Sequence, residues 1–175
     1  EGARLMHHDN TFGTPEEDAF RRDFTINALF YDIATFSIID YVNGLDDLRA
    51  GIVRSIGDPV VRFHEDPVRM LRAVALAARL DFTIDPPVAD AIRAQRLEIA
   101  RSSAPRLLEE YYKILRGGCA EKVFRGLAAT GLIEPSSAEL HRGAGDPLWR
   151  SLAALDAYRR QHESTPNGFT NAVLL

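Results

Sequence analysis

The chain has 175 residues, of which 46% are hydrophobic and 26% are charged, and its formal net charge is −4. This balance predicts a globular protein with one ordinary domain or two small ones. It excludes a helical membrane span, because no apolar run approaches ~18–20 residues. A single cysteine, Cys119, excludes an internal disulfide framework and a cysteine-rich zinc site, so we expect a cytoplasmic protein.

Charge is distributed unevenly along the chain. Residues 54–125 carry 13 basic and 10 acidic side chains, whereas residues 1–53 carry 4 and 10. The basic side chains are 19 arginines and 2 lysines. Arginine suits bidentate recognition of phosphates and base edges, but a GC-rich genome produces the same bias. Composition alone therefore leaves nucleic-acid binding open.

The first third of the chain predicts a small α+β unit. Glu16, Glu17 and Asp18 form an acidic first turn that favours a helix beginning at Pro15. Aromatic and β-branched runs that end at Asn43-Gly44 indicate a hairpin. We expect a helix at residues 15–29 and two hairpin strands at residues 29–33 and 37–42. A helical turn at residues 45–50 and a short strand at residues 52–56 should follow.

From Glu65 onward the apolar period becomes helical. Asp66 can cap a helix and Pro67 suits its first position, and this helix should end near Leu80. Further helices are expected at residues 86–99, 104–117, 121–130 and 147–160, with a linker at residues 142–146. The fold class is therefore mainly α, with a small α+β part at the N-terminus.

A first group of charged and polar side chains lies in residues 21–28. Arg22 and Asn27 could serve the phosphates and sugar of a nucleotide, and Asp23 could hold a metal ion or accept a hydrogen bond from a ribose hydroxyl. The alternative is a surface cluster of ion pairs that caps the helix leading into the hairpin.

A second group places Asp66, Arg69 and Arg72 three residues apart along the start of one helix. A carboxylate beside a guanidinium can match a base edge that presents an amine next to an acceptor, which would select adenine or cytosine. The alternative is an ion pair between Asp66 and Arg69 on a solvated helix face, worth a few tenths of a kcal/mol.

Other chemistries have little support in the sequence. His7, His8 and Asp9 invite comparison with metal-dependent phosphohydrolases, but the remaining histidines have no ligand-like spacing. No serine lies in a G-x-S-x-G elbow, and neither a P-loop nor a G-x-G-x-x-G pattern is present.

Taken in order, several segments resemble the successive motifs of class II nucleotidyltransferases, the family of bacterial poly(A) polymerases and CCA-adding enzymes. The resemblance covers roughly residues 5–135, and residues 10–18 look more like the poly(A) polymerase branch. The segments that carry it are residues 21–29, 39–48, 56–59, 62–63, 65–74 and 104–110.

The resemblance implies template-independent addition of nucleotides from ATP to an RNA 3′ end, assisted by two Mg²⁺ ions. It implies a part of the nucleotidyltransferase head at residues 1–57, a helical neck at residues 58–135 and the start of a helical body at residues 136–175. The implied roles are catalysis near the metal carboxylates for Asp23, nucleotide contact for Arg22, ribose-side geometry for Asn27, base recognition for Asp66 and Arg69, and phosphate contact for Arg72.

Two departures limit what the resemblance implies. The family usually carries an arginine one helical turn beyond Arg72, where this chain has Ala75. The chain also contains no Asp-x-Asp pair, which the family uses to hold its metals, so Mg²⁺ ligands are expected upstream of this chain, with Asp23 a possible addition. We therefore expect the 175-residue chain to lack polymerase activity by itself.

Three other functions remain open from the sequence. A CCA-adding enzyme would accept CTP as well as ATP and require a tRNA-like acceptor. A non-catalytic RNA- or nucleotide-binding module would explain the basic middle third without metal carboxylates. A purely structural protein would use the same helices for packing alone. An unpaired strand edge could also promote self-association, so the oligomeric state stays open.

Overall fold

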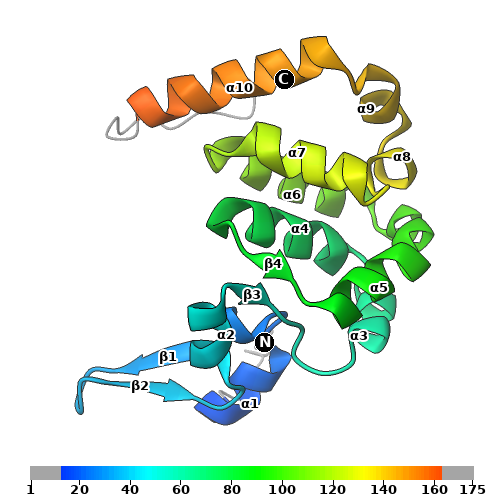
Figure 1. The fold of residues 1–175 in the computed structure, drawn as a ribbon. Coiled ribbons are helices and arrows are strands. Elements are labelled where there is room, and N and C mark those ends of the chain that lie inside the picture. The colour runs from blue at the N-terminus through cyan, green and yellow to red at the C-terminus, as the bar shows by residue number, and fades with distance from the viewer. Residues whose placement is uncertain (1–12, 163–175) are drawn as a thin grey trace, which may run out of the picture.

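The computed structural model describes residues 13–162, in which helices stack in layers beyond a projecting β-hairpin (Figure 1). The N-terminal elements are α1 (Pro15–Arg21), the 3-10 helix η1 (Thr25–Asn27), β1 (Leu29–Asp32), β2 (Ser37–Asp40), α2 (Gly44–Ala50) and β3 (Ile52–Val53). The elements that follow are α3 (Pro59–Glu65), α4 (Val68–Leu80), β4 (Thr83–Ile84), α5 (Pro86–Gln95), η2 (Arg96–Arg101), α6 (Ala104–Arg116), α7 (Ala120–Ala129), α8 (Ile133–Ser136), α9 (Ala138–Gly143) and α10 (Asp146–Gln161). The predicted fold class is confirmed.

Helix α1 begins as expected but ends early. Thr14 and Glu17 form a reciprocal capping box at its start. The prediction that this helix continues to about Leu29 is wrong, because the chain becomes extended at Arg22. The extension lets Phe24 pair with Ser55 in an antiparallel bridge. This pairing joins segments about thirty residues apart, so local helix periodicity did not reveal it.

The predicted hairpin is confirmed, with Leu29 opposite Asp40 and Asp32 opposite Ser37. Strand β2 ends at Asp40, just before α2, and the Asp40 carboxylate accepts hydrogen bonds from the backbone N–H groups of Val42, Gly44 and Leu45. Partial burial raises the pKa of Asp40, but the hydrogen bonds from these amides outweigh it, so the pKa lies below its ordinary value. The carboxylate therefore holds the start of α2 in its ionised form.

A short parallel pairing joins the N-terminal unit to the helices. Strand β3 pairs with β4, which the sequence analysis did not predict. Beside it, Arg54 forms ion pairs with Asp47 and Asp85, each at 3.0 Å, and so links α2 to the start of α5. The two units are thus connected by backbone and by side-chain contacts.

Most of the predicted helices are present, but the short helices α3, α8 and α9 were not predicted. Asp66 lies at the C-terminal end of α3, and its side chain does not accept a capping hydrogen bond from α4. The helix expected at residues 86–99 changes to a 3-10 helix at Arg96. The expected linker at residues 142–146 is largely helical, because α9 ends at Gly143 and α10 starts at Asp146.

The core lies between α4 and the helices on either side of it. Its fully buried large side chains come from α3, α4, α5, η2, α7 and the α7–α8 turn, and include Phe63, Met70, Leu71, Ile92, Ile99, Leu127 and Leu132. Because α4 packs its apolar face into this core, its polar face is held rigidly toward η1 and α6. Within residues 13–162, no helix has both the length and the apolar character needed to cross a bilayer.

Candidate functional site

Asp23 lies between two arginines of α4. Arg69 Nε is 2.9 Å from Asp23 Oδ1, and Arg72 Nη1 is 2.7 Å from Asp23 Oδ2. The Asp23 side chain is 8% exposed and that of Arg69 is 15% exposed. Arg69 and Arg72 reach the same carboxylate because they lie three residues apart on one helix face. The structure thus brings together residues from both groups that the sequence singled out.

Arg62, on α3, ties the end of α1 to the same place. Its Nη2 donates to the backbone carbonyls of Arg21 at 3.1 Å and Arg22 at 2.9 Å, while its Nη1 pairs with Glu65. The Arg62 carbonyl in turn accepts from Nη1 of Arg69 at 3.1 Å. Arg62 therefore fixes the backbone on which Asp23 is carried, a role that the sequence analysis did not assign.

Asp66 does not pair with Arg69. Its Oδ2 instead lies 2.7 Å from Nη2 of Arg106, at the start of α6, and the interpretation of an ion pair between Asp66 and Arg69 on one solvated helix face is wrong. The other oxygen of Asp66, Oδ1, is buried and accepts no hydrogen bond within residues 13–162. Such an unpaired buried acceptor is uncommon and calls for an explanation. Arg106 lies forty residues beyond Asp66, in the segment 104–110 that carries part of the family resemblance, and that membership was the available sequence signal.

Arg22 and Asn27 lie on the exposed side of the N-terminal unit. Arg22 pairs with Asp18 at 2.6 Å, and its guanidinium carbon lies 6.0 Å from the centre of the Phe30 ring. Asn27 is exposed on η1. The surface ion-pair interpretation of residues 21–28 therefore describes Arg22, whereas Asp23 is buried between helices.

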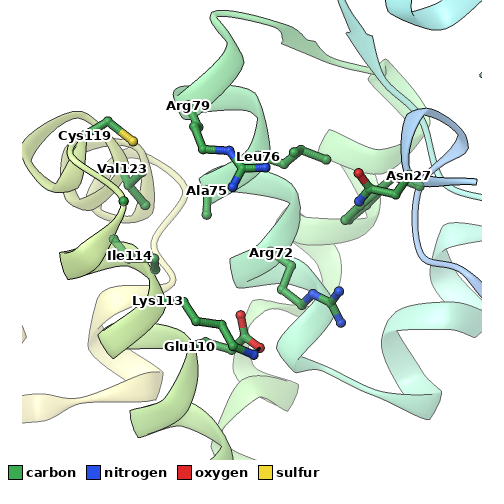
Figure 2. Close-up of a pocket in the computed structure, with 12 residues that line it drawn as sticks. Asn27, Arg72, Ala75, Leu76, Arg79, Glu110, Lys113, Ile114, Cys119 and Val123 are labelled. Atoms are coloured by element: carbon green, nitrogen blue, oxygen red, sulfur yellow. Dashed lines mark hydrogen bonds and ion pairs between the residues drawn. The ribbon is translucent and has the colours of Figure 1, made fainter. Parts of the chain in front are cut away.

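A pocket of about 220 Å³ lies between α4 and α6, beside η1. Figure 2 shows Asn27 and Arg72 on one side of this pocket, with Lys113 and Glu110 from α6 on another. Its lining residues are Phe24, Asn27, Arg72, Ala75, Leu76, Arg79, Glu110, Lys113, Ile114, Gly117, Cys119 and Val123. Of the six predicted site residues, Asn27 and Arg72 line it, and Arg22, Asp23, Asp66 and Arg69 do not. We call it the α4–α6 pocket.

A second hollow, of about 770 Å³, lies between α6 and α10 and has a largely apolar lining. None of the six predicted site residues lines it. The convergence of charged groups therefore favours the α4–α6 pocket as part of the functional site.

Known proteins similar to this chain were found at both the sequence and the structure level. A family profile described as "Poly A polymerase head domain" matches residues 2–54, and one described as "Probable RNA and SrmB- binding site of polymerase A" matches residues 81–142. The chain is 46% identical over 133 residues to poly(A) polymerase I of Salmonella typhi. This chain belongs to the class II nucleotidyltransferase family. Its predicted family membership is thereby confirmed.

Both branches of the class II nucleotidyltransferases are represented among its relatives. The match to the Salmonella enzyme covers 75% of this chain, which spans 28% of the length of that enzyme. The CCA-adding enzyme of Bacillus licheniformis is 41% identical over 119 residues, covering 68% of this chain and 30% of that enzyme.

Solved structures of this family share the fold. The Bacillus stearothermophilus CCA-adding enzyme in complex with CTP has a TM-score of 0.64 and 27% identity, covering 93% of this chain and 51% of that chain. A tRNA nucleotidyltransferase complexed with a primer tRNA and an incoming ATP analog has a TM-score of 0.63 and 30% identity, and the match covers 72% of this chain and 38% of that chain.

The described residues of this nucleotidyltransferase chain do not fit a metal ion. Each oxygen of Asp23 lies within ion-pair distance of a guanidinium group, that of Arg69 or that of Arg72, so two positive charges already neighbour this carboxylate. Elsewhere in residues 13–162, histidine, cysteine and acidic side chains nowhere gather in threes. The pattern His7-His8-Asp9 lies outside the described residues.

Cys119, in the α4–α6 pocket, should react slowly with alkylating agents. Burial raises the pKa of its thiol and the Asp156 carboxylate adds to this, against smaller opposing effects of Arg79 and Lys122. A higher pKa leaves less thiolate at a given pH. The rate of Cys119 alkylation by iodoacetamide, measured from pH 7 to 10, should therefore begin to rise at a higher pH in buffer than in urea, where the unfolded thiol has a pKa of ~8.5. Superimposable pH profiles in the two solvents would contradict this expectation.

Proposed function

We propose that the protein to which this chain belongs adds adenylate residues from ATP to RNA 3′ ends without a nucleic-acid template, as a poly(A) polymerase. The observation that carries this proposal is the pairing of Arg69 and Arg72, on α4, with Asp23, next to Asp66 at the junction of α3 and α4. The greater identity to poly(A) polymerase I than to the CCA-adding enzyme, 46% against 41%, supports the poly(A) branch.

Base choice is assigned to Asp66 and Arg69. Adenine presents an exocyclic amine beside a ring acceptor. In the proposed complex, Asp66 Oδ1, which lacks a partner among the described residues, accepts from the amine. Nη2 of Arg69, which donates no hydrogen bond within residues 13–162, supplies the matching donor. A protein-supplied base edge explains how an enzyme without a template can select its nucleotide.

The remaining predicted residues act on the rest of the nucleotide. Arg72 and Arg22 attract its phosphates, and Asn27 contacts its ribose side. Asp23 acts through Arg69 and Arg72, because it fixes the positions of both guanidinium groups. We propose residues 1–57 as a part of the head, residues 58–135 as the neck and residues 136–175 as the start of the body. Mg²⁺ would supply activation of the RNA 3′ hydroxyl when bound by residues other than those described.

Nucleotide binding by the 175-residue chain tests this assignment. Displacement of a fluorescent ATP analogue by ATP, CTP, GTP and UTP should give tighter binding of ATP than of GTP in the unmodified chain. Asp66→Ala should reduce this preference by about tenfold, since one good bidentate pair discriminates by about 1–3 kcal/mol. Asp46→Ala, which alters an exposed pair with Arg49, serves as the control.

The outcomes separate the candidate functions. An unchanged ratio of ATP to GTP affinity in Asp66→Ala would contradict the base-recognition role. Equal affinity for CTP and ATP would favour the CCA-adding alternative, which the identity to the Bacillus licheniformis enzyme also supports. Binding without any base preference would favour a non-catalytic binding module.

A further inference from the structure

The second hollow, between α6 and α10, is an apolar groove at the end of the helix stack. Figure 1 shows α10 as the outermost of the stacked helices, on the side away from the β-hairpin. Of the fourteen described residues that line the hollow, seven are leucines and none is charged. We call it the α6–α10 groove.

Part of the lining is open to a partner. Leu108, on α6, is 47% exposed, and Leu148 and Leu155, on α10, are half-buried. Leu148, Leu152 and Leu155 follow the spacing of one helix face, so α10 turns an apolar stripe toward the groove. An open apolar surface of this kind marks an interaction site.

The chemistry of the lining restricts what can bind there. A polynucleotide needs cations for its phosphates, and the described lining offers none. The hydroxyl groups of Tyr111 and Ser136 hydrogen-bond to each other at 2.6 Å, so these two polar groups already have a partner. Because an unpaired charge is costly to bury, the groove suits a segment with apolar and uncharged side chains.

The chain itself contains such a segment. Residues 163–175 follow α10 and lie outside the described residues. From Ser164 to Leu175 their sequence has no charged side chain, and five of the seven residues from 169 to 175 are apolar. This segment therefore matches the groove in polarity.

Its sequence pattern also matches a return along α10. Pro166-Asn167-Gly168 is typical of a turn. Phe169, Ala172 and Val173 have the spacing of one apolar helix face. Such a short helix is marginal in water by itself, so it needs an apolar surface to pack against.

The segment is long enough to reach the groove. Eight residues separate Phe169 from Gln161, where α10 ends, and an extended chain of this length spans up to about 26 Å. Leu148 lies thirteen residues before Gln161, roughly 20 Å back along the helix. Residues 169–175 can therefore reach the whole of the α10 stripe.

We propose that residues 169–175 turn back along α10 and bind in the α6–α10 groove. Attachment to α10 gives the segment an effective concentration in roughly the millimolar range. A second copy of the chain would bind only at its free concentration, which favours the chain's own segment as the occupant. This proposal does not depend on the choice of nucleotide under the proposed function.

An occupied groove would also support the candidate functional site. Helix α6 lines both hollows, with Leu108 in the α6–α10 groove and Lys113 in the α4–α6 pocket. Near its start, Arg106 pairs with Asp66 at 2.7 Å. The segment in the groove would therefore hold α6 in place from the side away from α4.

A nitroxide label on the segment tests the proposal in the 175-residue chain. The label is attached at Thr170→Cys after the single native cysteine is removed by Cys119→Ser. The methyl resonances of Leu108, Leu148 and Leu155 should lose intensity, whereas those of Val53, in the N-terminal unit, should keep it. Paramagnetic broadening of this kind reports which residues the segment approaches.

Two variants of the labelled chain separate binding from simple tethering. Val173→Asp places a charge on the apolar face of the segment and should restore the lost intensities, because the groove cannot compensate a charge. Asn171→Asp adds the same charge on the opposite face of the helical pattern. It is the matched control and should leave the intensity loss unchanged.

A second measurement avoids the label and keeps Cys119. In the otherwise unmodified chain, Val173→Asp should raise the fluorescence of the dye ANS, which binds exposed apolar surface. It should also lower the urea midpoint. Asn171→Asp should change neither value.

Three results would overturn the proposal. Equal methyl intensities with and without Val173→Asp would show that the segment is tethered nearby but does not bind. Equal dye fluorescence in Val173→Asp and the unmodified chain would show a groove left open for a separate partner. Intensity loss that occurs only between chains, in a mixture of nitroxide-labelled and isotope-labelled copies, would assign the groove to a second copy.

Discussion

Replacement of Asp23 by alanine is expected to lower the free energy of unfolding by about 3 kcal/mol, the low end of the range for a broken buried ion pair. The change leaves two guanidinium groups, those of Arg69 and Arg72, without their shared counter-charge. Arg69 is the more costly of the two because its side chain is almost buried, whereas Arg72 can turn toward water. Urea denaturation of the chain measures the effect.

Two variants separate the buried charge from ordinary surface pairing. Asp46→Ala removes an exposed partner of Arg49 and should change the free energy of unfolding by less than about 1 kcal/mol. Asp23→Asn keeps the shape of the side chain and some of its hydrogen bonding but loses the charge. Its loss in free energy of unfolding should therefore lie between those of Asp23→Ala and Asp46→Ala. If the urea midpoint of Asp23→Ala were as close to that of the unmodified chain as the midpoint of Asp46→Ala is, the ion pairs of Asp23 with Arg69 and Arg72 would contribute little to stability.

The sequence pattern within single segments correctly predicted the hairpin and the longer helices. The hairpin strands contain runs of aromatic and β-branched residues, and α4, α6 and α7 have clear apolar stripes, so short-range pattern was sufficient for them. The early end of α1 and the pairing of β3 with β4 depend on partners distant in the chain. Phe24 reaches Ser55, and Val53 pairs with Ile84, which periodicity within either segment does not reveal.

The same distinction between local pattern and distant partners applies to the candidate site. The family resemblance indicated Asp23, Asp66, Arg69 and Arg72, but not which charges pair. Asp66 finds Arg106 forty residues later, and a spacing rule within one helix could only suggest Arg69. Residue type and spacing thus predicted which residues belong to the site, whereas three-dimensional packing determines which of their charges pair.

Gly44→Ala is expected to lower the free energy of unfolding by about 2–3 kcal/mol, as for an overpacked buried position. A Cβ atom at Gly44 would lie 2.3 Å from the backbone oxygen of Thr25 and 3.1 Å from Cδ2 of Leu29. The Leu29 side chain can adjust, but the Thr25 backbone is held from both sides. Its N–H donates to the Arg54 carbonyl at 3.0 Å, and its hydroxyl donates to Asp47 at 2.7 Å.

The same clash should disturb the candidate site, because Thr25 begins η1, which carries Asn27 at its other end. We therefore expect Gly44→Ala to shift the backbone amide resonance of Asn27 as well as to lower the urea midpoint. Gly143→Ala is the matched control: no atom lies within 4 Å of its added Cβ, and alanine favours helix α9. A Gly44→Ala chain as stable as the Gly143→Ala chain, with Asn27 unshifted, would mean that α2 moves away from η1 at little cost. In that case, the contact at Gly44 would not be what positions Asn27 beside Arg72.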